Sequence, residues 1–266
     1  MLPSVLSKTL RDSRRALAWW SLGLCGLVSM IVAVFPSVRG NAGLNKLVQD
    51  YPEALKAFIA FGGSVDYTSA AGYLGSELFS FTVPLLLLVA AIGAGARAIA
   101  GEEEQGTLDL LLANPISRRR LVLEKLGALV VEVAFLGVVL WIALAIGTRL
   151  AGMEIGLANL AAATLDAALL ALLFGVLALL VGSSVGRRGL ALTVSATAAV
   201  AAYLVNALAA IVGALEPVQK LSPFYHYVAG DPLRHGLAVE HTAVLAVAAA
   251  ALAALAPLVF ARRDLT

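Results

Sequence analysis

The chain has 266 residues, of which 61% are hydrophobic and only 14% are charged, and its formal net charge at pH 7 is +2. A soluble domain is roughly half apolar and a quarter charged, so this composition argues against a soluble domain. No basic stripe interleaved with aromatic residues is present, which argues against a nucleic-acid-binding protein. The composition indicates a protein whose solvent is a lipid bilayer.

Six apolar runs are long enough to cross a bilayer, whose hydrocarbon core needs roughly 20 helical residues. They are residues 17–35, 78–99, 121–146, 165–185, 190–215 and 242–260. The predicted fold class is therefore all-α, a polytopic membrane protein with about six transmembrane helices in a single domain, residues 1–266. Basic residues precede the first run, as they do in a cleaved signal peptide. Its length and the lack of an A-x-A site favour a retained helix.

The positions of Lys and Arg predict the orientation, because short loops rich in these residues stay on the cytoplasmic side. With the N-terminus inside, the cytoplasmic segments contain Lys8, Arg11, Arg14, Arg15, Arg97, Arg118, Arg119, Arg120, Lys125, Arg187, Arg188, Arg262 and Arg263. The outer segments contain Arg39, Lys46, Lys56, Arg149, Lys220 and Arg234. We therefore expect a multi-pass protein of the plasma membrane with both termini in the cytoplasm.

Two segments outside the spans show helical spacing of apolar residues. In residues 1–16, apolar and basic positions separate as on an amphipathic helix, which predicts a helix lying in the inner interface. A plain positively charged flank remains the alternative. In the outer segment, residues 37–76, apolar residues recur at i, i+3, i+4 and i+7 around Pro52. This pattern predicts two short amphipathic helices, with a surface loop as the alternative.

A dense block of charge, GEEEQGTLDLLLANPISRRR at 101–120, lies between the second and third spans on the predicted cytoplasmic side. The glutamates fall at the start of a predicted short helix, where free N–H groups favour carboxylates. Leucines form one apolar face, Pro115 ends the helix, and Ser117 can cap the helix that leads into the third span. Such a helix lies flat on the membrane or docks into a cytosolic partner. Three glutamates argue against contact with an anionic leaflet.

Residues 102–118, EEEQGTLDLLLANPISR, followed by Lys125, resemble the signature after the second helix of ABC-2 type permeases of ABC transporters, E-x-x-x-G-T-L-x-x-L-L-x-x-P-[IV]-S-R. The resemblance extends through the six-span plan over essentially the whole chain. It implies that residues 101–120 form a coupling helix seated in a cleft of a cytosolic ATPase. It also implies that two permease subunits pair with two ATPases, and that the N-terminal interfacial helix has a counterpart in the family.

By position, the resemblance implies a set of ATPase contacts and a set of residues that shape the turn into the third helix. The implied contacts are Glu102, Glu103, Glu104, Gly106, Thr107, Leu108, Leu111 and Leu112. The implied turn residues are Pro115, Ser117 and Arg118.

No catalytic, cofactor or metal site is predicted in this chain. It contains no G-x-x-x-x-G-K-[ST] phosphate loop, so ATP and Mg²⁺ are expected on the separate ATPase and the chain is expected to be non-enzymatic. Residues 93–98 match a relaxed dinucleotide pattern but end an apolar run instead of following a strand. The spacing of His226, His235 and His241 fits no short metal motif, which favours surface or interfacial histidines.

Three polar residues within the predicted spans are candidates for the translocation path or for contacts between helices. Glu132 lies well inside the third span, and either role fits it, because an ionisable group there usually faces protein or water. Asp166 is near the outer end of the fourth span, where it could reach water, but a structural contact between helices is favoured for it. Asn206 is deep in the fifth and is expected to hydrogen-bond across helices.

The sequence thus predicts the membrane subunit of an ABC exporter, working as a homodimer or with a similar second permease. A cavity lined by Ala, Leu and Val would favour an amphipathic or apolar cargo such as a drug or antibiotic. The alternative is an ATP-independent secondary carrier or a membrane scaffold. A carrier is expected to show coupling-ion residues and broken helices near the midplane, for which only Glu132 and residues 93–95 give a hint.

Overall fold

The computed structural model describes residues 4–39, 69–112, 116–209 and 211–263, without the side chains of Leu110 and Leu112. In these ranges every regular element is a helix, and six helices are long and apolar enough to cross a membrane. They are α1 (Val5–Val38), the continuous run Ala70–Glu104, α8 (Arg118–Leu150), α9 (Leu157–Val185), α10 (Arg188–Ala209) and α14 (Val239–Arg262). The predicted all-α, six-span architecture is confirmed.

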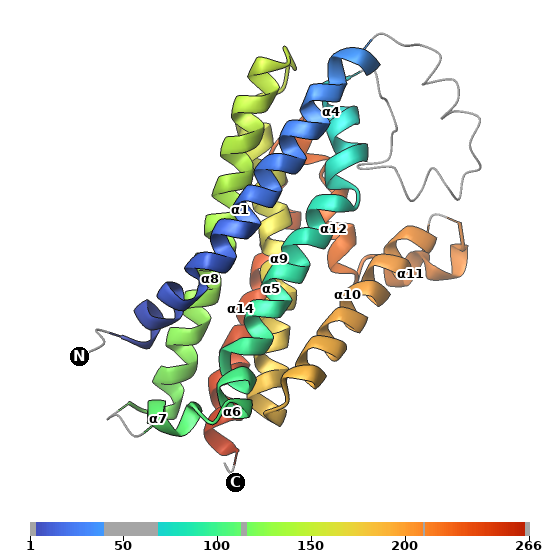
Figure 1. Ribbon diagram of the computed structural model, residues 1–266. Helices are drawn as coiled ribbons and strands as arrows, with labels where there is room; N and C mark the ends of the chain where they lie inside the picture. The colour runs from blue at the N-terminus through green and yellow to red at the C-terminus, as the bar shows by residue number, and fades with distance from the viewer. Residues whose placement is uncertain (1–3, 40–68, 113–115, 210, 264–266) are drawn as a thin grey trace.

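The spans form one bundle around α9, which packs against α5 (Thr82–Ala96), α8, α10 and α14. Small residues allow the closest of these approaches: a Cβ added to Gly95 of α5 would lie 2.0 Å from the carbonyl oxygen of Gly175 in α9. Between helices in lipid, such close backbone contact replaces the hydrophobic drive that is missing there. The first turns of α1 and the last turn of α14 lie at the same end of the bundle as the short helices α6 (Glu102–Glu104) and α7 (Leu108–Leu112) (Figure 1).

Helix α1 is a single helix of 34 residues, and Ser4 caps it by accepting a hydrogen bond from the backbone N–H of Ser7. The predicted interfacial helix of residues 1–16 is therefore not a separate element, because its described part forms the first turns of the first span. Hydrophobic and basic residues alternate there without a helix breaker, so no local signal ends the helix before the span begins.

The second span contains two π-helical turns, where each turn holds an extra residue. Its elements are α4 (Ala70–Leu74), the π-helix η1 (Gly75–Phe79), α5, the π-helix η2 (Arg97–Gly101) and α6 (Glu102–Glu104). Of the outer segment 37–76, residues 40–68 lie outside the described residues, and so do the two amphipathic helices predicted there.

The glutamates 102–104 end this helix, and the prediction that they begin a new one is wrong. The N–H of Thr107 bonds to the carbonyl of Glu102 at 2.9 Å and the N–H of Gly106 to that of Glu103 at 3.0 Å. Gly106 has a φ of +66°, so these bonds form a glycine-terminated helix end. The short helix α7 (Leu108–Leu112) starts only after this turn. The carboxylates tolerate the negative end of the helix dipole because cations from other helices face them.

The fifth span is shorter than predicted, since α10 ends at Ala209 and not at residue 215. The chain then forms the 3₁₀ turn η3 (Gly213–Leu215), α11 (Glu216–Gln219), α12 (Pro223–Ala229) and α13 (Pro232–His235) before α14. Ser222 donates its hydroxyl to the carbonyl of Ala202 at 2.8 Å, which holds this returning segment against α10. The predicted span was too long because residues 211–215 are apolar and hydropathy does not show where a helix ends.

Candidate functional site

The acidic segment, residues 102–109, consists of α6, the turn after it and the first two residues of α7. It lies at the same end of the bundle as the first turns of α1 and the last turn of α14 (Figure 1). Its three consecutive glutamates each contact a different part of the chain. Successive residues of an α-helix point about 100° apart, so three neighbouring side chains reach three different surroundings.

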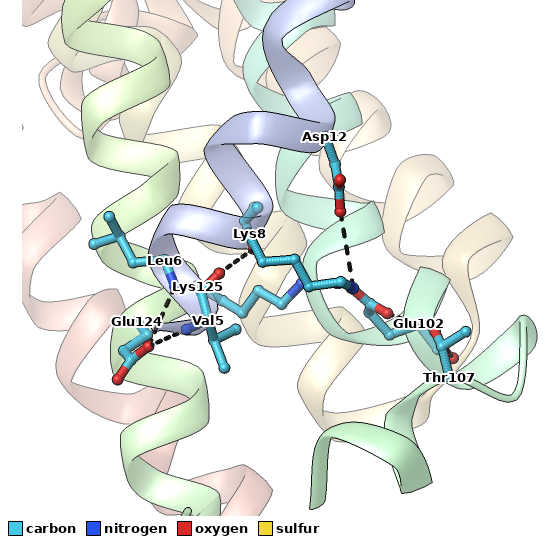
Figure 2. Close-up of polar contacts among 9 residues, drawn as sticks. Val5, Leu6, Lys8, Asp12, Glu102, Thr107, Glu124 and Lys125 are labelled. Atoms are coloured by element: carbon cyan, nitrogen blue, oxygen red, sulfur yellow. Dashed lines mark hydrogen bonds and ion pairs between the residues drawn. The ribbon is translucent and has the colours of Figure 1, made fainter. Parts of the chain in front are cut away.

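Glu102 connects the acidic segment to α1 and α8, as Figure 2 shows. Its Oε1 accepts a hydrogen bond from Lys125 Nζ at 2.6 Å and lies 3.6 Å from Lys8 Nζ. Its Oε2 accepts the hydroxyl hydrogen of Thr107. Lys8 also faces Asp12 at 3.8 Å. The side chain of Lys125 is only 3% exposed, so its ammonium depends on Glu102 for neutralisation.

Glu103 connects the acidic segment to the end of α14. Its carboxylate pairs with both terminal guanidinium nitrogens of Arg263, and Arg118 Nη1 donates to the backbone carbonyl of Arg263 at 2.7 Å. Gly186, at the turn between α9 and α10, lies against this pair. A Cβ on Gly186 would come within 2.2 Å of Arg263 and 2.5 Å of Glu103, and its φ of +70° also favours glycine.

Glu104 connects the acidic segment to α10, because its Oε1 accepts the backbone N–H of Arg188 at 2.8 Å. Arg188 is the first residue of α10, so the carboxylate satisfies one of the free N–H groups at a helix N-terminus. The three glutamates together link the acidic segment to α1, α8, α10 and α14.

Glu124 makes a related contact that the sequence did not reveal. Its Oε2 accepts the backbone N–H groups of Val5 and Leu6 at 2.7 and 3.2 Å (Figure 2). Arg120 Nε pairs with its Oε1 at 3.0 Å. The first turn of α1 is thus capped by a carboxylate from α8. No local pattern predicts this contact, because the two partners are about 120 positions apart in sequence.

The residues predicted as ATPase contacts differ in their exposure. Of these, Glu104 and Gly106 are exposed, as are their neighbours Gln105 and Asp109, whereas Leu108 is 3% exposed and packs into the core of this chain. Leu111 is half-buried against the same core. In this arrangement the leucine face anchors α7 to the bundle, which removes Leu108 from any surface that a partner could touch.

At the start of α8, the predicted cap is confirmed: Ser117 Oγ accepts the N–H of Arg120 at 3.3 Å. The side chain of Leu112 and all of Pro115 lie outside the described residues. Arg118 is half-buried and bonds to Arg263 as given above.

The three polar residues predicted within the spans all lie between elements of this chain. Glu132 is 6% exposed and faces Ser13 of α1 and Arg97 of η2. Asp166 is 2% exposed and accepts the hydroxyl hydrogen of Thr242 in α14 at 2.7 Å, so it makes the favoured contact between helices and is not exposed to water.

Asn206 lies in the last turn of α10, because that helix ends at Ala209, and is therefore less deep than predicted. It accepts hydrogen bonds from Gln219 Nε2 at 3.3 Å through both its side-chain oxygen and its carbonyl. The expected contact across helices is present, with the short helix α11 as the partner.

The structure brings His226 and His241 together, with their Nδ1 atoms 3.1 Å apart, whereas sequence spacing gave no reason to pair them. His226 Nε2 lies 3.0 Å from the carbonyl of Lys220 and must donate to it. Its Nδ1 then accepts a hydrogen from His241. Among the described residues no group of three or more metal-ligating side chains occurs.

The stability of the protein is expected to fall in mild acid because of His226. Burial lowers the pKa of His226 below its ordinary value of 6.5, the Lys220 carbonyl opposes this shift, and His241 adds to it. Below pH 6.5 the unfolded chain binds a proton more readily than the folded one, so the free energy of unfolding decreases as the pH falls through the lowered folded-state pKa. Thermal unfolding of His226→Gln should lose this part of the pH dependence, and His235→Gln should keep it. An unchanged pH profile in His226→Gln would contradict the assignment.

These features define a multi-pass membrane protein of six helices whose charged segment joins helix ends at one face. A sequence profile of the family described as ABC-2 family transporter protein matches residues 4–265. The chain therefore belongs to this family, whose members are membrane components of ABC transporters and work with a separate ABC ATPase. No curated protein matches the chain at a significant level.

Proposed function

We propose that the chain is the permease subunit of an ABC exporter in the plasma membrane, with both termini in the cytoplasm and a cytosolic ATPase docked on the acidic segment. One observation carries this proposal: three consecutive glutamates tie the segment to α1, α8, α10 and α14. A partner that moves the segment therefore displaces four helices at once. Such rigid-body shifts between alternative packings are a general means of switching a transporter.

The proposed docking surface is polar and consists of exposed residues between the end of α6 and the first turn of α8. They are Gln105, Gly106, Asp109, Ser117 and Arg119. Leu108 and Leu111 pack against the core and hold α7 on the bundle. Through their ion pairs, Glu102 and Glu103 pass a movement of this surface to α8 and α14. ATP and Mg²⁺ belong to the ATPase in this proposal, and two ATPases serve two permease chains.

A groove between α5 and α10 supports an apolar cargo and a paired arrangement. It has a volume of about 130 Å³ and is lined mainly by apolar and aromatic side chains, among them Phe81, Leu85, Val200, Tyr203 and Phe224. Helices α1, α10 and α14 are the spans least covered by the rest of the chain. A second permease chain placed against α5 and α10 would close this groove, which fits export of an amphipathic or apolar compound such as a drug or antibiotic.

Charge reversal on the docking surface tests the ATPase contact. Asp109→Arg is expected to reduce the amount of nucleotide-binding chain that co-purifies with the tagged permease at least tenfold, because reversing a charge on the proposed surface disturbs its charge complementarity with the ATPase. Asp109 is exposed, so the thermal stability of the permease should not change. Glu154→Arg, at an exposed position in the loop between α8 and α9, is the matched control. Equal recovery of the ATPase with both variants would contradict the docking surface.

Labelling of single cysteines tests the orientation independently of any partner. In a Cys25→Ser background, Gln105→Cys should react with a membrane-impermeant maleimide only after the cells are opened. Glu154→Cys should react in intact cells. The reverse pattern would place the acidic segment away from cytosolic ATP and would favour an ATP-independent carrier.

A further inference from the structure

A polar cavity of about 310 Å³ lies beside the acidic segment, between the first turns of α1, the end of the second span and the start of α8. Its volume is that of a small-ligand site. Its charged lining residues are Lys8, Arg97 and Lys125 on the positive side and Asp12, Glu102 and Glu132 on the negative side. The balance of charges suits a ligand that carries both signs.

A narrow slot continues from this cavity toward the middle of the membrane. The two hollows share Ser13, Ala16, Ala94, Arg97 and Glu132. The slot adds apolar side chains farther along each of the three helices that form it: Leu17 and Trp20 of α1, Ala90 and Ala91 of α5, and Val133 and Leu136 of α8. Together the hollows form a site with a polar end at the helix ends and an apolar end within the spans.

Most of the charges in the cavity neutralise one another, but Arg97 and Glu132 do not make close pairs. Lys125 and Lys8 are bound to Glu102, and Asp12 faces Lys8. Within the described ranges, Arg97 forms no hydrogen bond and no ion pair at contact distance, and it is exposed. Its positive charge acts on the Glu132 carboxylate from farther away. Glu132 is buried with the Ser13 hydroxyl as its hydrogen-bond donor.

A guanidinium that lacks a close acceptor is suited to a phosphate, which it binds through two parallel hydrogen bonds. A buried carboxylate without a cation at contact distance is suited to an ammonium group, because an unpaired charge there is costly. Both groups face the same cavity, and the slot beyond them is apolar. An amphiphile with a phosphate and a primary ammonium matches all three parts of the site.

We propose that this site binds a zwitterionic phospholipid from the leaflet next to the acidic segment. The phosphate lies on Arg97 and the ammonium lies near Glu132. The slot has a volume of only about 20 Å³, so the first carbons of one acyl chain enter it beside Trp20 and Leu136 and the rest of the chain lies in the bilayer. Such a lipid holds α1 against α5 and α8 next to Glu102. The inference is independent of the ATPase and concerns the permease chain alone.

The test uses the purified permease in detergent, without ATPase, and native mass spectrometry to count bound lipid. Phosphatidylethanolamine is expected to be retained at least fivefold better than phosphatidylglycerol with the same acyl chains. Soluble phosphoethanolamine, which lacks the chains, should need at least a tenfold higher concentration to compete. Preference for phosphatidylglycerol would overturn the zwitterionic assignment, and equal competition by phosphoethanolamine would overturn the lipid as the source.

Variants locate the site on the same readout. Arg97→Gln, at an exposed position that should not disturb folding, is expected to abolish the preference for phosphatidylethanolamine. Glu132→Gln should reduce the preference by removing the ammonium partner. Arg149→Gln, an exposed arginine at the other end of α8, is the control and should retain the wild-type preference. Gel filtration checks that Arg97→Gln is folded. If the folded variant keeps the wild-type preference for phosphatidylethanolamine, the proposal is overturned.

Discussion

Replacing Glu102 by Gln is expected to lower the free energy of unfolding by about 3 kcal/mol, because the buried ammonium of Lys125 loses its neutralising carboxylate. The substitution keeps the shape of the side chain and one carbonyl acceptor, so the decrease in the free energy of unfolding measures the effect of removing the negative charge. Lys8, which lies 3.6 Å from the same carboxylate oxygen, loses a partner as well. Chemical unfolding in mixed micelles measures the change.

A double substitution separates the charge from the packing. Lys125→Met together with Glu102→Gln removes the buried ammonium, so the pair should lose clearly less stability than the sum of the two single variants. Glu240→Gln is the matched control, since that side chain is 85% exposed and should change stability by less than about 0.5 kcal/mol. Additive losses in the double variant would show that Lys125 does not depend on Glu102.

Replacing Gly95 by Ala is expected to destabilise the bundle by about 3 kcal/mol or to prevent its folding. The added methyl group would lie 2.0 Å from the Gly175 carbonyl oxygen and 3.2 Å from the Leu179 nitrogen, and backbone cannot turn aside as a flexible side chain can. Helices α5 and α9 would have to separate along the closest contact of the bundle. The yield of monodisperse protein and its thermal unfolding temperature measure the effect.

Gly26→Ala is the matched control for this crowding. Gly26 also lies within a transmembrane helix, but a Cβ there meets nothing within 4 Å in the described chain. Alanine is the better helix former by about 0.8–1 kcal/mol, so this variant should be at least as stable as the wild type. Similar losses in Gly26→Ala and Gly95→Ala would contradict the close approach of α5 to α9 as the cause of the loss at Gly95.

The spans were predictable because a bilayer imposes a length and an apolar composition that a single sequence displays directly. The family signature likewise lies in consecutive residues. The cap formed by Ser117 is local and was predictable for the same reason.

The contacts that join distant helices were not predictable from sequence. Glu102, Glu103 and Glu104 were interpreted as an N-terminal acidic turn, because the sequence does not show that Lys125, Arg263 and the first N–H of α10 supply their partners. The pairing of His226 with His241 depends on how the segment after α10 folds back. Leu108 was predicted to contact the ATPase but packs into the core of this chain, because an apolar helix face does not show by itself whether it covers a partner or its own bundle.

The π-helical turn η2 sets the angular phase of the glutamates that follow it. One residue more or less before position 102 turns the helix by about 100°, so each glutamate would be presented where its neighbour now stands. The π-helical turn absorbs one such residue, so deleting one residue from Arg97–Gly101 would restore regular helix geometry and keep each glutamate facing its present partner. A deletion within the regular helix α5 would instead turn the three glutamates away from Lys125, Arg263 and the first N–H of α10.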